Sequence, residues 1–115
     1  MDENYQNLVN AIILRAAKDY RVSRTYLKNH PKTDELVAIA EKQKQRRKKR
    51  KEKCEALGLP KTEERIAPEE QVLTRIVYYE RLLDDTERFF GSAWFSQLSD
   101  LDGCAILKRL EAEFA

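Results

Sequence analysis

The chain has 115 residues, of which 37% are charged and 42% hydrophobic, and it contains three glycines and three prolines. This composition excludes a turn-rich sandwich or barrel and favours long helices in a single domain covering residues 1–115. No apolar run approaches the ~20 residues that cross a bilayer. The acidic beginning also differs from a signal peptide, so we expect a cytoplasmic protein.

The first predicted helix begins after Asp2, whose carboxylate can cap it. Apolar residues then recur at spacings of three and four as far as Leu27, and the segment 29–31 ends the helix at a proline. Because this spacing runs unbroken across Arg21, it predicts one continuous helix over residues 8–27.

A second helix is predicted over about 34–57, capped by Thr33 or Asp34. Its apolar face ends after Ala40, so residues 41–57 are expected to form a basic helical extension that projects into solvent. Gly58 suits the left-handed position that closes a helix, and a connector follows over 58–67.

The third helix is predicted to begin at Pro68 and to end at Gly91. Ser92 can cap a short turn, and Ser99 or Asp100 can cap a last helix. The sequence therefore predicts an all-α fold, a small helical bundle with long helices and no strand of four residues or more. We expect the following large side chains to be buried together: Leu8, Ile13, Phe90, Trp94, Leu107 and Leu110.

The strongest functional indication is the segment 42–53, which holds nine basic residues and one acid, Glu52. The rest of the chain has 13 basic and 19 acidic residues, so a mildly acidic body carries one strongly basic segment. The charges are expected to point all round the helix, with no face kept for packing. Like charges three and four residues apart repel, which indicates an anionic partner, with nucleic-acid phosphates foremost. The alternative is a solvated, solubilising helix. The candidate binding residues are Lys42, Lys44, Arg46, Arg47, Lys48, Lys49, Arg50, Lys51 and Lys53.

Two other stretches carry a family likeness. Residues 17–21 read AKDYR and are followed by Leu27-Lys28 and Pro31, while residues 87–95 read ERFFGSAWF and continue to Gly103. Together they resemble a family of small, largely uncharacterised helical proteins encoded by phages and prophages of Gram-positive bacteria. The resemblance implies a helical fold and the cytoplasm of a bacterial host cell, and it carries no catalytic residues.

Residues 22–27, VSRTYL, are similar to the recognition helix of helix-turn-helix proteins, including tetracycline-repressor-like regulators. In those proteins the position before Val-Ser usually holds a glycine, because the chain bends tightly there. Here the position is Arg21. A regulator of this kind would use Ser23, Arg24, Thr25 and Tyr26.

The other polar and aromatic groups favour structural roles. A single histidine and two distant cysteines, Cys54 and Cys104, do not form a zinc site, and the thiols are expected to be reduced and buried. Residues 100–103 are expected to cap a helix rather than bind calcium. The helical spacing of the aromatic cluster favours the core over a base-stacking platform, with Tyr78 the most exposed member. That cluster comprises Tyr78, Tyr79, Phe89, Phe90, Trp94 and Phe95.

These observations predict a non-enzymatic phage-type binding protein with no catalytic residue, no metal site and no cofactor. Its expected partner is nucleic acid or a host nucleoprotein complex, contacted through the basic helix. One form of this function is an anti-defence inhibitor such as an anti-CRISPR. A membrane partner is not expected, because the basic segment has no apolar face. The alternatives are a helix-turn-helix regulator and a protein–protein adaptor or homo-oligomer, in which another chain is met by Leu36, Ala40, Cys54 and Leu57.

Overall fold

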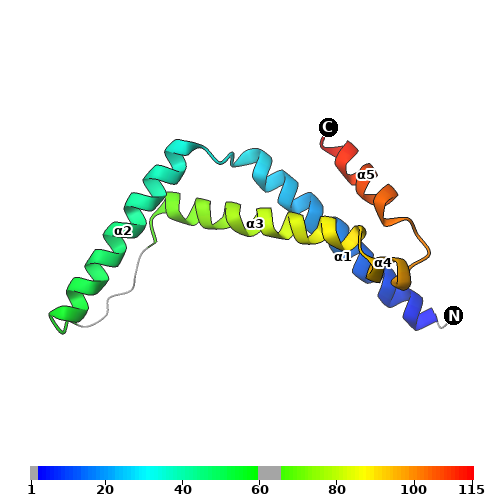
Figure 1. The fold of residues 1–115 in the computed structure, drawn as a ribbon, viewed down its shortest axis with the longest axis horizontal. Coiled ribbons are helices and arrows are strands. Elements are labelled where there is room, and N and C mark those ends of the chain that lie inside the picture. Colours follow the sequence, from blue (N-terminus) through cyan, green and yellow to red (C-terminus); the bar gives the residue numbers. More distant parts are fainter. Residues whose placement is uncertain (1–2, 60–65) are drawn as a thin grey trace. The chain divides into compact units, whose positions relative to one another are not determined.

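The computed structural model describes residues 3–59 and 66–115, and within these ranges it contains five α-helices and no β-strand. This confirms the all-α prediction. In chain order (Figure 1) the helices are α1 (Glu3–Asn29), α2 (Asp34–Ala56), α3 (Pro68–Phe90), α4 (Ala93–Leu98) and α5 (Gly103–Glu113). The proposed cap at Asp2 and most of the connector lie outside the described residues.

The helices group into two compact units, divided between Asn29 and His30 and between Val77 and Tyr78. The first unit is built from α1, the C-terminal part of α3, α4 and α5. The second is built from α2 and the N-terminal part of α3. The whole of α2 therefore belongs to the second unit.

Helix α1 is continuous from Glu3 to Asn29, as the apolar spacing predicted. Ser23 is completely buried, and its hydroxyl donates a hydrogen bond to the carbonyl oxygen of Asp19 at 2.7 Å. The guanidinium of Arg24 lies over the rings of Tyr20 and Phe114, at 5.8 and 5.6 Å. The helix-turn-helix alternative therefore loses the bend that it requires, and two of its proposed DNA-reading side chains are packed within the first unit.

One apolar cluster holds the first unit together, and all of its helices contribute to it. The prediction is confirmed for Ile13, Phe90 and Leu110, and Leu107 packs half-buried against them. It is wrong for Leu8 and Trp94, which are 58% and 54% exposed. The buried members of the cluster are Val9, Ile13, Ala16, Ala17, Tyr20, Phe90, Phe95 and Leu110.

In both cases the residue that follows in the chain is buried instead of the predicted one. A helix turns by about 100° per residue, so Val9 and Phe95 face the core while Leu8 and Trp94 are turned away from it. The Trp94 ring still packs edge-on against Phe89, with ring centroids 5.5 Å apart.

The C-terminal helices are capped by side chains. Ser92 caps α4 as predicted, since its hydroxyl accepts a hydrogen bond from the Phe95 backbone N–H at 3.1 Å. The cap of α5 is Asp102, which accepts from the N–H groups of Cys104 and Ala105, so the prediction of Ser99 or Asp100 is wrong. Residues 100–103 therefore supply a helix cap, as the sequence predicted.

The reason for this shift is the packing of Gly103, the first residue of α5. A Cβ at Gly103 would lie 1.9 Å from the carbonyl oxygen of Phe90, so only a glycine fits against the end of α3. Tertiary contact therefore sets where α5 begins.

In the second unit, Thr33 caps α2 as predicted: its hydroxyl accepts from the Leu36 N–H at 3.1 Å. Gly58 has a φ of +67°, the left-handed conformation expected after the helix, and the Leu59 N–H donates to the Cys54 carbonyl at 3.0 Å.

Both cysteines are free thiols. Cys54 is half-buried, but Cys104 is exposed, so the prediction of two buried thiols is wrong for Cys104.

Candidate nucleic-acid interface on α2

The basic segment 42–53 is helical throughout its length. Thr33 caps the helix, Asp34 and Glu35 lie in its first turn, and Lys53 lies in its last turn. Acids at the N-terminus and a base at the C-terminus both favour a helix, because they oppose its macrodipole. Local capping and charge thus support a helix whose basic half has no apolar residue between positions 41 and 53.

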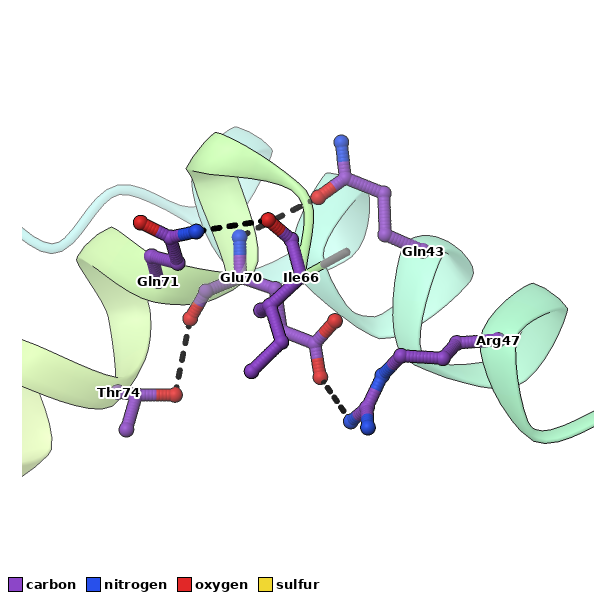
Figure 2. Close-up of polar contacts among 6 residues, drawn as sticks. All are labelled: Gln43, Arg47, Ile66, Glu70, Gln71 and Thr74. Carbon is purple, nitrogen blue, oxygen red and sulfur yellow. Dashed lines mark hydrogen bonds and ion pairs between the residues drawn. The ribbon is translucent and has the colours of Figure 1, made fainter. Parts of the chain in front are cut away.

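One side of the basic segment is attached to the first turn of α3. The Gln43 side-chain amide donates to a Glu69 carboxylate oxygen at 2.7 Å, and its carbonyl accepts from the Glu70 backbone N–H at 3.2 Å. Four residues later, Arg47 Nη2 donates to Glu70 Oε1 at 2.6 Å (Figure 2). Residues four apart lie on the same face of a helix, so Gln43 and Arg47 hold α2 against α3 together.

The acids of this attachment are well placed. Glu69 and Glu70 lie in the first turn of α3, where the helix dipole favours negative charge. The hydrogen bond from Gln43 is the largest cause that lowers the pKa of Glu69. The Arg47 and Glu70 side chains are 29% and 10% exposed, so the ion pair is largely screened from water.

Two further hydrogen bonds order the beginning of α3. Gln71 Nε2 donates to the Ile66 carbonyl at 2.7 Å, and the Thr74 hydroxyl donates to the Glu70 carbonyl at 2.9 Å (Figure 2). The turn that presents Glu70 to Arg47 is therefore held by its own side chains.

The expectation that the basic helix keeps no face for packing is wrong. Apart from Val37, the side chains of α2 that are shielded from solvent form a single line, which we call the anchor line. The helical periodicity of the sequence could have identified the anchor line, because Gln43 and Arg47 continue the spacing of the apolar face that begins at Leu36. The search for apolar residues missed it, since this part of the face is polar. The anchor line runs through Leu36, Ala40, Gln43, Arg47 and Cys54.

The other eight candidate cations are all exposed. Within residues 3–59 and 66–115, none of the eight forms an ion pair with an acidic side chain. They remain available to an external anion. They are Lys42, Lys44, Arg46, Lys48, Lys49, Arg50, Lys51 and Lys53.

The aromatic cluster does not form a stacking platform, because Phe90 and Phe95 are buried in the core. Tyr79 is half-buried and packs on Tyr26, with ring centroids 4.6 Å apart. Tyr78 is 59% exposed, which confirms that prediction.

The surface proposed for an adaptor is divided between interior and solvent. Ala40 is 1% exposed and is already covered within the chain, whereas Leu57 is 63% exposed. An adaptor could therefore present Leu57 to another chain, but not Ala40.

In the described ranges, no three His, Cys, Asp or Glu side chains lie together as a metal site requires. Over the same residues, no helix combines the length and the apolar character needed to cross a membrane.

Comparison with known proteins found no matching family model, no similar curated protein and no similar solved structure. The resemblance to phage-encoded proteins therefore stays a prediction.

Proposed function

We propose that this chain is a non-enzymatic binding protein whose basic helix contacts nucleic acid, either free or within a host nucleoprotein complex. The observation that carries the proposal is the set of eight exposed cations on α2 that form no ion pair with any acidic side chain of residues 3–59 and 66–115. They occupy twelve consecutive residues, a helical length of ~18 Å at ~1.5 Å per residue. Nucleic acid is the partner whose own charge is repeated closely enough to match such a segment.

The cations of α2 repel one another along the helix. Lys44 and Lys48, and likewise Arg46 and Arg50, are four residues apart, and each such like-charge pair costs a few tenths of a kcal/mol. A row of phosphates relieves this repulsion and releases its own condensed counterions. The acidic first turn of α3 neutralises Arg47 alone, so the helix is held in place without losing its charge.

The direct test measures the affinity of the purified chain for labelled duplex and single-stranded nucleic acid at low salt. The variant K44E/R46E/K48E/R50E leaves the Arg47–Glu70 contact unchanged and should abolish binding while keeping the wild-type melting temperature. The matched control K18E/R75E/R81E/K108E makes the same change in charge at exposed cations outside α2 and should retain most of the affinity. Equal loss in both variants would show a general charge effect, and absence of wild-type binding to any nucleic acid would refute the proposal.

The resemblance to phage proteins adds a biological context to this proposal. A phage protein of this size that binds a nucleoprotein can act as an anti-defence inhibitor, of which anti-CRISPR proteins are one kind. Capture from host lysate with and without nuclease treatment tests this form. A partner that persists after nuclease treatment and is still captured by the α2 reversal variant would favour the adaptor alternative.

A further inference from the structure

The attachment of Gln43 and Arg47 to α3 fixes which way every other side chain of the basic segment faces. With about 100° of rotation per residue, the surface of α2 divides into the anchor line, two flanks and an outer line opposite the anchor. Lys44, Lys48 and Lys51 lie about 40–100° to one side of Arg47 and form the first flank. Arg46, Arg50 and Lys53 lie about 60–120° to the other side and form the second flank.

The positive charge is concentrated on the flanks. Within residues 42–53, each flank holds three cations at positions i, i+4 and i+7 and no acid, and Glu55 follows on the first flank one turn beyond Lys51. The outer line consists of Lys42, Gln45, Lys49 and Glu52 and has a net charge of only +1. A helix adapted to a single flat row of phosphates would carry its highest charge on the outer line, opposite the element that holds it.

We infer that α2 lies in the major groove of B-form duplex DNA, with one flank on each phosphate backbone and the outer line toward the base pairs. This inference rests on the proposed function and specifies its ligand. Over residues 42–53, two flanks of three cations each, separated by a nearly neutral line, match a ligand that has a phosphate wall on each side.

The dimensions agree with this arrangement. The major groove of B-form DNA is about 12 Å wide and admits an α-helix, and a helix with its side chains is about 10–12 Å in diameter. In this orientation Glu69 and Glu70, which contact the anchor line, lie on the side of α2 away from the base pairs. Duplex RNA is a poor ligand for the same surface, because its major groove is too narrow and deep for side chains to read.

The outer line fits the floor of a groove better than a phosphate row. Glu52 would be repelled by phosphates, but a carboxylate can accept a hydrogen bond from the cytosine amino group at the groove floor. Gln45 can donate to and accept from adenine at the same depth. The acid within this basic segment thus has a place in the complex.

The test compares two flank variants of the whole chain, K44A/K48A/K51A and R46A/R50A/K53A, by salt titration on a B-form duplex. Six phosphate contacts predict a slope of log K against log salt of roughly −5, and each variant, with three contacts left, should give roughly −3. The matched control K18A/R81A/K108A should retain the wild-type slope. A duplex RNA of the same sequence should bind at least about tenfold more weakly.

A chemical footprint at saturating protein shows which groove of the duplex is occupied. Occupancy of the major groove should protect guanine N7 from methylation, since that atom lies in the major groove. Reactive N7 atoms, equal affinity for duplex RNA, or loss confined to one flank would overturn the inference while nucleic-acid binding stood. A wild-type chain that binds no nucleic acid at low salt would overturn both.

Discussion

Arg47 Nη2 lies 2.6 Å from Glu70 Oε1, and Arg47 supplies the one ion pair that the described residues give to this carboxylate. The second carboxylate oxygen of Glu70 is buried and, within the described part of the chain, accepts no hydrogen bond. A nearly buried negative charge is costly without a positive partner. The contact between α2 and the first turn of α3 therefore depends on Arg47, and the exposed cations beside it in α2 do not replace it.

Arg47→Ala should destabilise the protein by about 1–3 kcal/mol, because it leaves the Glu70 carboxylate without its charged hydrogen-bond donor. Chemical denaturation followed by circular dichroism measures this change. Arg50→Ala removes an exposed cation from the same helix and should change stability by less than about 0.5 kcal/mol. If the two variants unfold alike, the Arg47–Glu70 pair does not hold the helices together.

Gly103→Ala should cost about 3 kcal/mol, the upper end of the range for overpacking, because its Cβ would lie 1.9 Å from the Phe90 carbonyl oxygen. Gly91→Ala is the matched control, since its Cβ would make an ordinary contact of 3.6 Å with the Glu87 carbonyl oxygen. That variant should be neutral or gain up to about 1 kcal/mol from the lower entropy of the unfolded chain. Equal melting temperatures for the two variants would contradict the close approach of α5 to α3.

Phe95→Ala should cost roughly 3–5 kcal/mol, because this ring is 1% exposed and lies in the core of the first unit. Trp94→Ala should cost no more than about 1.5 kcal/mol, the worth of its edge-on packing against Phe89. Thermal melts of both variants provide the comparison. A larger loss for Trp94→Ala would show that the adjacent residue faces the core.

The Arg21–Glu113 ion pair predicts a pH dependence. The hydrogen bond from Arg21, at 2.9 Å, is the largest cause that lowers the pKa of Glu113 below its ordinary value of 4.5. A carboxyl group with a lowered folded-state pKa stabilises the fold above its ordinary pKa, and this contribution is lost as the pH falls through the folded value. Glu113→Gln should therefore lower the melting temperature near neutral pH, and the difference from wild type should vanish in acid.

Glu111→Gln serves as the control for this pH effect, because it removes the same charge two residues away from the ion pair. It should show a smaller difference from wild type near neutral pH. A difference between wild type and Glu113→Gln that is constant from neutral pH to acid would exclude a contribution from this carboxylate.

The fold was predictable where local spacing decides it. The unbroken apolar repeat gave α1, Thr33 and Gly58 marked the two ends of α2, and Pro68 marked the start of α3. Local patterns failed where contacts distant in sequence decide, as at Gly103, whose approach to Phe90 moved the cap of α5 to Asp102.

The candidate site shows the same division. The run of basic residues in the sequence identified the segment 42–53, but it could not show that Arg47 differs from its neighbours. That difference arises because Glu70, 23 residues further along the chain, is brought to it by a second helix. The division of the cations into two flanks follows only once this contact fixes the orientation of α2.

The absence of apolar residues between positions 41 and 53 also has a consequence for local opening. Beyond Arg47, the half-buried Cys54 is the next α2 side chain shielded from solvent. The backbone hydrogen bonds of residues 48–56 should therefore break in fluctuations that need far less free energy than global unfolding. Their amides should exchange with deuterium much faster than those near Ala40, and a bound polyanion should slow that exchange most strongly in this half of the helix.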